Sequence, residues 1–172
     1  MNYSGMSIRI TGKQGIRMVT SIDRDKKAAL TGDGLAGYTL VEYGTAVAFA
    51  DALGNRHPLV LGGTNVRSNY AYKRGVADPV FGYDGNMLQY TNVLVGFSES
   101  QCGKDLAMRP YMILEDAEGE RITLYGGVVY RSIGYIAYQL RDTFDTGTEA
   151  YAYVWDIIRS VYGDAYDEGS AA

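Results

Sequence analysis

The segment that most constrains the fold of this chain runs from Leu106 to Leu140. Within it, the apolar run Met108–Leu114 is followed by a charged, glycine-containing turn at 115–120 and by a second β-rich run, Arg121–Tyr125. Two such runs around a short turn predict a β-hairpin. The pattern then changes to helical spacing, and Ser132 can cap a helix whose apolar face is formed by Ile133, Ile136, Ala137 and Leu140. The segment therefore predicts strand, turn, strand and helix.

Most of the remaining chain also has the pattern of strands. Four more strands are predicted by β-rich runs at residues 7–10, 16–22, 38–50 and 86–97. Gly44 lies inside one of these runs and predicts a bulge or a close backbone approach. Leu59–Leu61 predicts a short edge strand. Residues 62–85 have no regular pattern and are expected to form a long loop.

Two further helices are predicted. Asp23 can cap a short helix at residues 24–30. Thr146 and Glu149 form a capping-box pair before the clearest helical pattern in the chain, which Gly163 ends. The apolar face of this last helix, expected to pack against the sheet, consists of Tyr151, Val154, Trp155, Ile158, Val161 and Tyr162.

Together these elements predict a mostly β protein, an antiparallel β-sandwich-like domain with two or three peripheral α-helices. A chain of 172 residues suffices for one such domain. We expect a single β-rich module at residues 1–163 and a flexible acidic tail at 164–172. The sequence contains no run of about 18 apolar residues, so no membrane span is expected in this chain.

Composition argues against several classes of function. The formal net charge of −4 argues against nucleic acid as the main partner. Cys102 and His57 are single residues of their types, which is too few for a structural zinc site and gives no support to a hydrolytic triad. We expect no metal, no cofactor and no catalytic residues. An enzyme with two facing carboxylates is the least favoured alternative, because a sequence does not show which carboxylates face each other.

Three charged residues lie inside apolar strand runs: Arg17, Glu42 and Arg109. Charges in such positions are usually paired when the strand is buried. We therefore expect a shared structural ion-pair network beneath a sheet edge, in preference to a ligand site, with Arg17 and Glu42 as direct partners.

The chain has 16 tyrosines and only 4 phenylalanines. Tyrosine rings can stack on the apolar faces of sugar rings, and amide, carboxylate and guanidinium groups can bind the hydroxyls. The 62–90 segment concentrates such residues, and we expect a glycan site there. Its stacking platforms would be Tyr70, Tyr72 and Tyr83, and its hydrogen-bonding groups Asn69, Arg74 and Asp84. The competing explanation is that these rings pin a long loop to the sheet, which is favoured for Tyr72.

An ordered set of motifs resembles a known module. The motifs are Gly15–Ile22, Gly37–Gly44, Ala71–Ala77, Arg109–Tyr111, and Tyr125-Gly126 before a helix. The set resembles a poorly characterised β-rich module in secreted and cell-surface proteins of anaerobic Firmicutes, where it occurs beside dockerins, bacterial Ig-like repeats and glycoside hydrolases. The resemblance covers about residues 7–162. It implies a non-catalytic extracellular module of a larger secreted, cell-surface or cellulosomal chain, and it carries over no catalytic residues.

The expected function is therefore binding, with a plant polysaccharide as the expected ligand and neighbouring modules of a surface protein as further partners. The alternative is a structural or protein-interaction module that spaces or anchors its neighbours. Exposed aromatic rings along one face would favour sugar binding, and their absence would favour the structural alternative.

Overall fold

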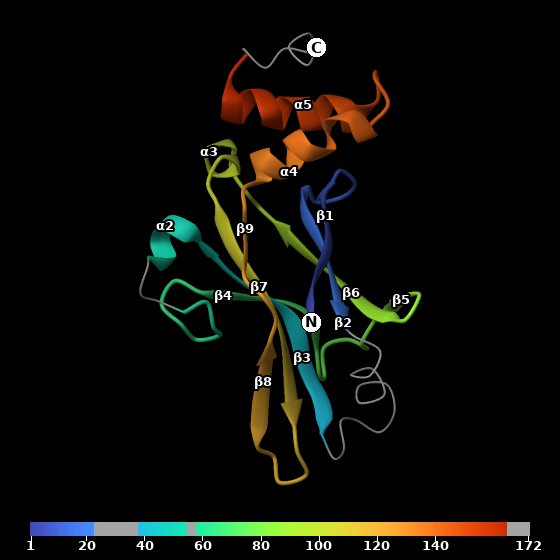
Figure 1. Cartoon of the computed structure of the whole chain (residues 1–172), viewed down its shortest axis with the longest axis vertical. Coiled ribbons are helices and arrows are strands. Elements are labelled where there is room, and N and C mark those ends of the chain that lie inside the picture. Colours follow the sequence, from blue (N-terminus) through green and yellow to red (C-terminus); the bar gives the residue numbers. More distant parts are fainter. Residues whose placement is uncertain (23–37, 55–57, 165–172) are drawn as a thin grey trace.

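The computed structural model describes residues 1–22, 38–54 and 58–164, which form two antiparallel sheets with most of the helices gathered at one end (Figure 1). Sheet A has the strand order β1 (Asn2–Arg9), β2 (Gly15–Ile22), β6 (Met87–Val95), β5 (Gly82–Asp84). Sheet B has the order β4 (Arg67–Lys73), β3 (Thr39–Phe49), β7 (Leu106–Glu115), β8 (Arg121–Tyr125), and β9 (Val129–Arg131) also pairs with β7. The predicted mostly β, sandwich-like fold is confirmed.

The helices are α2 (Ala50–Leu53), α3 (Glu99–Cys102), α4 (Ile133–Leu140), the 3-10 helix η1 (Arg141–Thr143) and α5 (Glu149–Tyr162). Ser132 caps α4 as predicted, because its Oγ accepts a hydrogen bond from the Tyr135 amide at 3.0 Å. For α5 the predicted cap was wrong, since Thr148 rather than Thr146 accepts the amide hydrogen of Tyr151. Across the described residues, no helix is both long and apolar enough to cross a bilayer.

Several predicted elements differ from the structure. Leu59–Leu61 is not a strand, although Leu59 is buried against the outer face of sheet B. The 62–85 segment, expected to be a loop, contains β4 and β5. The short helices α2 and α3 were not predicted, and each is a single turn. The helix expected at 24–30 lies outside the described residues, as does most of the acidic tail.

The faces of the two sheets that meet in the middle are apolar. The side of β2 predicted to be buried is buried throughout, at Ile16, Met18, Thr20 and Ile22. Opposite lies a cluster of aromatic rings around Tyr43, whose centroid is 4.5 Å from that of Tyr90 and 5.2 Å from that of Tyr72. The Tyr90 hydroxyl donates to the Gly44 carbonyl at 3.0 Å. Much of the tyrosine enrichment therefore builds the core.

Gly44 confirms the close approach that its position in a strand predicted. The β3–β4 register shifts between Tyr43 and Gly44. A Cβ at Gly44 would lie 2.3 Å from the carbonyl oxygen of Asn69, a distance that no side chain tolerates. Glycine is required here because the backbones of the two strands nearly touch.

Helices α3, α4 and α5 gather at one end of the sandwich, with α5 outermost (Figure 1). The buried side chains of α5 are Val154, Trp155, Ile157 and Ile158. This face was expected to lie on a sheet, but α5 packs mainly on α4 and α3. The helices approach closely at Gly134, where a Cβ would lie 2.8 Å from a methyl carbon of Val161. We call the end of the sandwich that carries α3, α4 and α5 the capped end.

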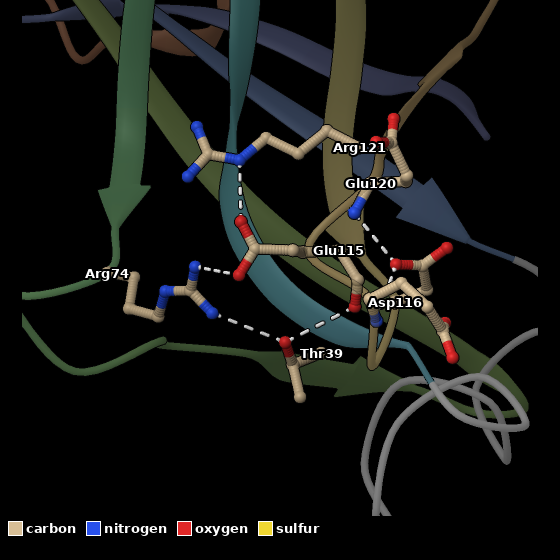
Figure 2. Close-up of polar contacts among 7 residues, drawn as sticks. Thr39, Arg74, Glu115, Asp116, Glu120 and Arg121 are labelled. Atoms are coloured by element: carbon tan, nitrogen blue, oxygen red, sulfur yellow. Dashed lines mark hydrogen bonds and ion pairs between the residues drawn. The ribbon is translucent and has the colours of Figure 1, made fainter.

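The opposite end of sheet B carries a network of charges centred on Glu115 (Figure 2). Its Oε2 accepts from Arg121 Nε at 2.6 Å, and its Oε1 contacts Arg74. Arg74 also donates to Thr39 Oγ1 at 3.3 Å. The hydrogen bond from Arg74, and after it the one from Arg121, lowers the pKa of the Glu115 carboxyl. The network joins the ends of β4, β3, β7 and β8. We call this end of sheet B, opposite the helices, the hairpin end.

Candidate functional site

A cavity of about 630 Å³ opens between the two sheets beside α3. It is larger than two other cavities, of about 380 and 400 Å³. Its walls come from the last residues of β3, the start of β4, the end of β6, and α3. The lining side chains that define its chemistry are Phe49, Arg67, Asn69, Leu94, Phe97 and Gln101. We call this space the inter-sheet cleft.

Local sequence features hold the cleft open. Strand β6 ends at Val95, and Gly96 takes a positive φ of 86° that turns the chain away from the sheet. On the other wall, Asn65 has a φ of 61°, and its side-chain amide donates to the Ala52 carbonyl at 2.8 Å. Asparagine tolerates this left-handed conformation better than most residues. Both walls therefore end in fixed turns.

Asn69 closes the bottom of the cleft by bridging the sheets. Its Nδ2 donates to Asn92 Oδ1 at 2.8 Å and to the Val93 carbonyl at 3.0 Å. Since both hydrogen bonds use Nδ2, the Oδ1 acceptor has no partner among the described residues. Asn69 was predicted to bind ligand from a loop; the structure instead places it on a strand, at the wall of a cavity.

The cleft combines apolar and polar chemistry. Phe49, Leu94 and Phe97 supply apolar surface, and each is partly or wholly buried. Arg67 is exposed, and no carboxylate of the described residues pairs with it. A pocket of a few hundred Å³ with apolar walls and a few polar groups is the usual form of a small-molecule site. An unpaired guanidinium at its rim can donate several hydrogen bonds to a ligand.

The predicted platforms Tyr70 and Tyr72 point to opposite sides of sheet B. In the β3–β4 register, Tyr72 pairs with Tyr43 and Tyr70 with Gly44, so Ala71 is an extra residue that reverses the alternation. Tyr72 is 7% exposed and stacks on Tyr43 in the core. It cannot stack on a ligand, as the competing explanation anticipated. Tyr70 is 49% exposed on the outer face, beside Lys73.

The other predicted site residues lie elsewhere. Tyr83, 61% exposed, and Asp84 belong to β5 at the edge of sheet A. Arg74 is engaged by Glu115 and Thr39 at the hairpin end. The predicted glycan site on a single loop is therefore not assembled: of its six residues, only Asn69 lines the cleft.

The predicted ion pair between Arg17 and Glu42 was also wrong in its partners. Arg17 is exposed on β2 of sheet A. Glu42 is 7% exposed on the outer face of sheet B, where its Oε2 lies 3.1 Å from Lys73 Nζ. Alternation along β2 places Arg17 opposite the buried face of its strand, away from sheet B. A charge was correctly expected to be paired, but its partner came from the neighbouring strand.

Hydroxyl groups complete the surroundings of Glu42. Its Oε1 accepts from the Tyr111 hydroxyl at 2.5 Å and from Ser68 Oγ at 3.2 Å. Burial raises the pKa of Tyr111, and the hydrogen bond to the carboxylate raises it further. The phenol therefore stays protonated and donates. The cluster satisfies a buried carboxylate and pins β4 to the sheet.

Arg109 pairs with no carboxylate of the described residues. Its Nε donates to the Gly126 carbonyl at 2.8 Å, and its guanidinium lies 4.5 Å from the ring centre of Tyr125. Burial of this cation is thus compensated by backbone oxygen and by an aromatic face. Its expected place in a shared ion-pair network is not observed.

The described residues contain no group of three or more His, Cys, Asp or Glu side chains placed to hold a metal ion. Cys102 is buried, and burial raises the pKa of its thiol. The raised pKa keeps the thiol protonated and poorly nucleophilic. His57 lies outside the described residues.

The sequence prediction missed Phe49, Arg67 and Phe97 as site residues. Each stands at the beginning or end of a strand, where the sheets part. A usable signal was present: Gly96 precedes Phe97, and a capped helical turn follows it, as the Ser98 amide donates to the Gln101 side chain at 2.9 Å. Which strand ends meet across the cleft follows from the sheet order, which a sequence does not show.

Comparisons with protein-family models, curated proteins and solved structures found no match to this chain.

Proposed function

We propose that this protein is a non-catalytic binding module that holds a carbohydrate chain in the inter-sheet cleft. The observation that carries the proposal is the cleft itself, about 630 Å³ with phenylalanine and leucine in its walls. At its rim lies Arg67, with which no carboxylate in the described part of the chain pairs. A sugar ring has apolar C–H faces bounded by hydroxyls. Phe49 and Phe97 offer apolar contact surface, while Arg67 and the free Oδ1 of Asn69 offer a donor and an acceptor for hydroxyls.

The origin of the ligand rests on the motif resemblance and not on the cleft. We propose a plant polysaccharide as the ligand and a larger secreted, cell-surface or cellulosomal protein as the setting. The alternative, a module that anchors or spaces neighbouring domains, is favoured by a different feature, the exposed edge strand β8, which is treated below.

The experiment is a binding screen of the full chain against soluble and insoluble polysaccharides, followed by calorimetry on whichever glycan is retained. Arg67→Ala is expected to weaken binding about tenfold or more, because the hydrogen bonds that the guanidinium at the rim of the cleft can donate to ligand hydroxyls are lost. Phe97→Leu is expected to weaken it less, since apolar volume is largely kept.

Tyr70→Ala and Tyr83→Ala are matched controls, because both rings are exposed and lie outside the cleft. They should bind like the native chain, and thermal melts should show all four variants folded. Failure of every polysaccharide to be retained would contradict the proposed ligand. Loss of binding in the Tyr70 or Tyr83 variant, with Arg67→Ala unaffected, would move the site to the outer surface.

A further inference from the structure

Among the described residues, the edge strands are β1 and β5 of sheet A and β4, β8 and the three-residue β9 of sheet B. All of them except β8 have a feature that hinders pairing with another strand. β1 has a register irregularity between Tyr3 and Gly5. β4 contains the bulge at Ala71 and carries Arg67 and Lys73. β5 is only three residues long. Bulges, charges and short length are the usual means of preventing edge-to-edge association.

The remaining edge strand, β8, has no bulge, and its one charged residue, Arg121, is already paired with Glu115. Its register with β7 is regular from Tyr111–Tyr125 to Glu115–Arg121. Ile122 pairs with Leu114, and Leu124 pairs with Met112, so both lie on the side of sheet B that is buried elsewhere. Here, however, Ile122 is 38% and Leu124 is 42% exposed. The β7–β8 hairpin extends to the far end of the molecule, away from the helices (Figure 1).

The two residues that flank Thr123 in β8, Ile122 and Leu124, are both apolar. The outer two differ, since Arg121 is a cation and Tyr125 an aromatic ring. In an antiparallel pair of identical strands centred on Thr123, Ile122 meets Leu124 as an apolar pair. Arg121, already bound to Glu115, lies opposite Tyr125, whose ring already contacts Arg109. No like charges are directly opposed, because the charged residue of the strand faces a tyrosine.

We propose that β8 is a self-association surface, through which two copies of this chain join sheet B edge to edge about a two-fold axis at Thr123. Ile122 then packs against the partner's Leu124, and Leu124 against the partner's Ile122, which removes both from water. On the opposite face, Arg121 lies across from the partner's Tyr125. The free backbone N–H and C=O groups of the edge are satisfied by the same groups of the second copy.

A second copy fits this edge better than an arbitrary strand because the pairing is isologous. A partner of unrelated sequence would need to supply an apolar pair on the face that carries Ile122 and Leu124. The β8 strand of a second copy supplies this pair by its own sequence. The inter-sheet cleft is bordered by β4, the edge of sheet B opposite β8, so association through β8 leaves it open.

The proposed register can be tested by placing charged residues at the paired positions 122 and 124. The dimer dissociation constant is measured by sedimentation or light scattering of the full chain over a range of concentrations. Ile122→Lys/Leu124→Lys places lysine opposite lysine and is expected to raise the dimer dissociation constant at least about tenfold. Ile122→Lys/Leu124→Glu removes the same apolar surface but places lysine opposite glutamate. It is expected to dimerise more tightly than the double-lysine variant.

Val76→Lys/Val80→Lys is the matched control, since Val76 and Val80 are exposed apolar residues outside β8. It should dimerise like the native chain. Thr123→Cys gives an independent readout: the residue lies on the proposed axis, and the native thiol, Cys102, is buried. Mild oxidation should yield a disulfide-linked dimer, because directly opposed Cβ atoms lie within disulfide reach.

A native chain that stays monomeric at every concentration would overturn the proposal and leave β8 to a strand from another protein. Equal dissociation constants for the lysine–lysine and lysine–glutamate variants would also overturn it, because the register would then be wrong. Thr123→Cys that forms no covalent dimer would contradict the position of the axis.

Discussion

The two ends of the sandwich differ in how much of their apolar surface is covered. At the capped end, the apolar surfaces of the sheets are covered by α3, α4 and α5, and Trp155 is 8% exposed. At the hairpin end no helix of the described residues covers sheet B, Leu124 is 42% exposed, and the strands are joined through Glu115 (Figure 2). Apolar burial contributes far more free energy than surface ion pairs do. The capped end should therefore supply stability, and the hairpin end should remain available for contact.

The largest expected difference between the ends is in side-chain truncation. Trp155→Ala should lower the free energy of unfolding by about 3–5 kcal/mol, because it leaves a cavity among α5, α4 and α3. Leu124→Ala should cost less than about 1 kcal/mol, since much of the side chain is already in water. Denaturant melts of both variants, at a concentration where the native chain is monomeric, test this directly. Similar losses of stability for the two variants would show that the capped end does not supply more stability than the hairpin end.

Trp155→Phe sharpens the result. The indole Nε1 is buried without a hydrogen-bond partner among the described residues. Phenylalanine removes this unsatisfied donor while keeping most of the apolar volume, so its cost should be much smaller than that of alanine.

An intermediate effect is expected at Glu42, on the outer face between the two ends. Glu42→Ala removes the acceptor for the buried Tyr111 hydroxyl and should cost about 1–3 kcal/mol. Arg17→Ala should change stability by less than about 0.5 kcal/mol, because its side chain is exposed. Urea unfolding of the two single variants measures the two losses of stability. Equal, large losses would restore the Arg17–Glu42 pair that the structure does not contain.

The smallest effect is expected from Glu115, and it depends on pH. Its pKa is lowered in the folded state by Arg74 and then by Arg121, so the folded chain holds fewer protons than the unfolded chain. Its stabilising contribution is present above the ordinary carboxyl pKa of about 4.5 and is lost as the pH falls through the lowered value. Melting temperatures of native and Glu115→Gln chains should differ at neutral pH and converge in acid. A constant difference across that range would show that the network is not electrostatic.

The backbone framework was largely predictable, because local patterns determine it. The 106–140 segment became β7, β8 and α4, with Ser132 as the helix cap. The alternation of β2 gave the correct buried face. Strand β4 was missed because its sequence, Arg67–Lys73, has no two-residue alternation; the bulge at Ala71 interrupts it.

The site was much less predictable, because it depends on which strand ends meet. Asn69 was identified as a candidate, but its neighbours in the cleft, Phe49 and Phe97, are distant in sequence. Tyr70 and Tyr72 were treated as equivalent, although one extra residue between them sends one ring outward and the other into the core. The partner of Glu42 depended in the same way on strand order, which places Lys73 beside it.

Ligand binding in the inter-sheet cleft can be tested by an amide chemical-shift titration of the labelled full chain with an oligosaccharide from a retained polysaccharide. If the cleft is the binding site, the largest shifts should occur at residues 65–69 and 94–97, on its two walls. Largest shifts at β5 or β8 instead, or no shifts at saturating oligosaccharide, would contradict it.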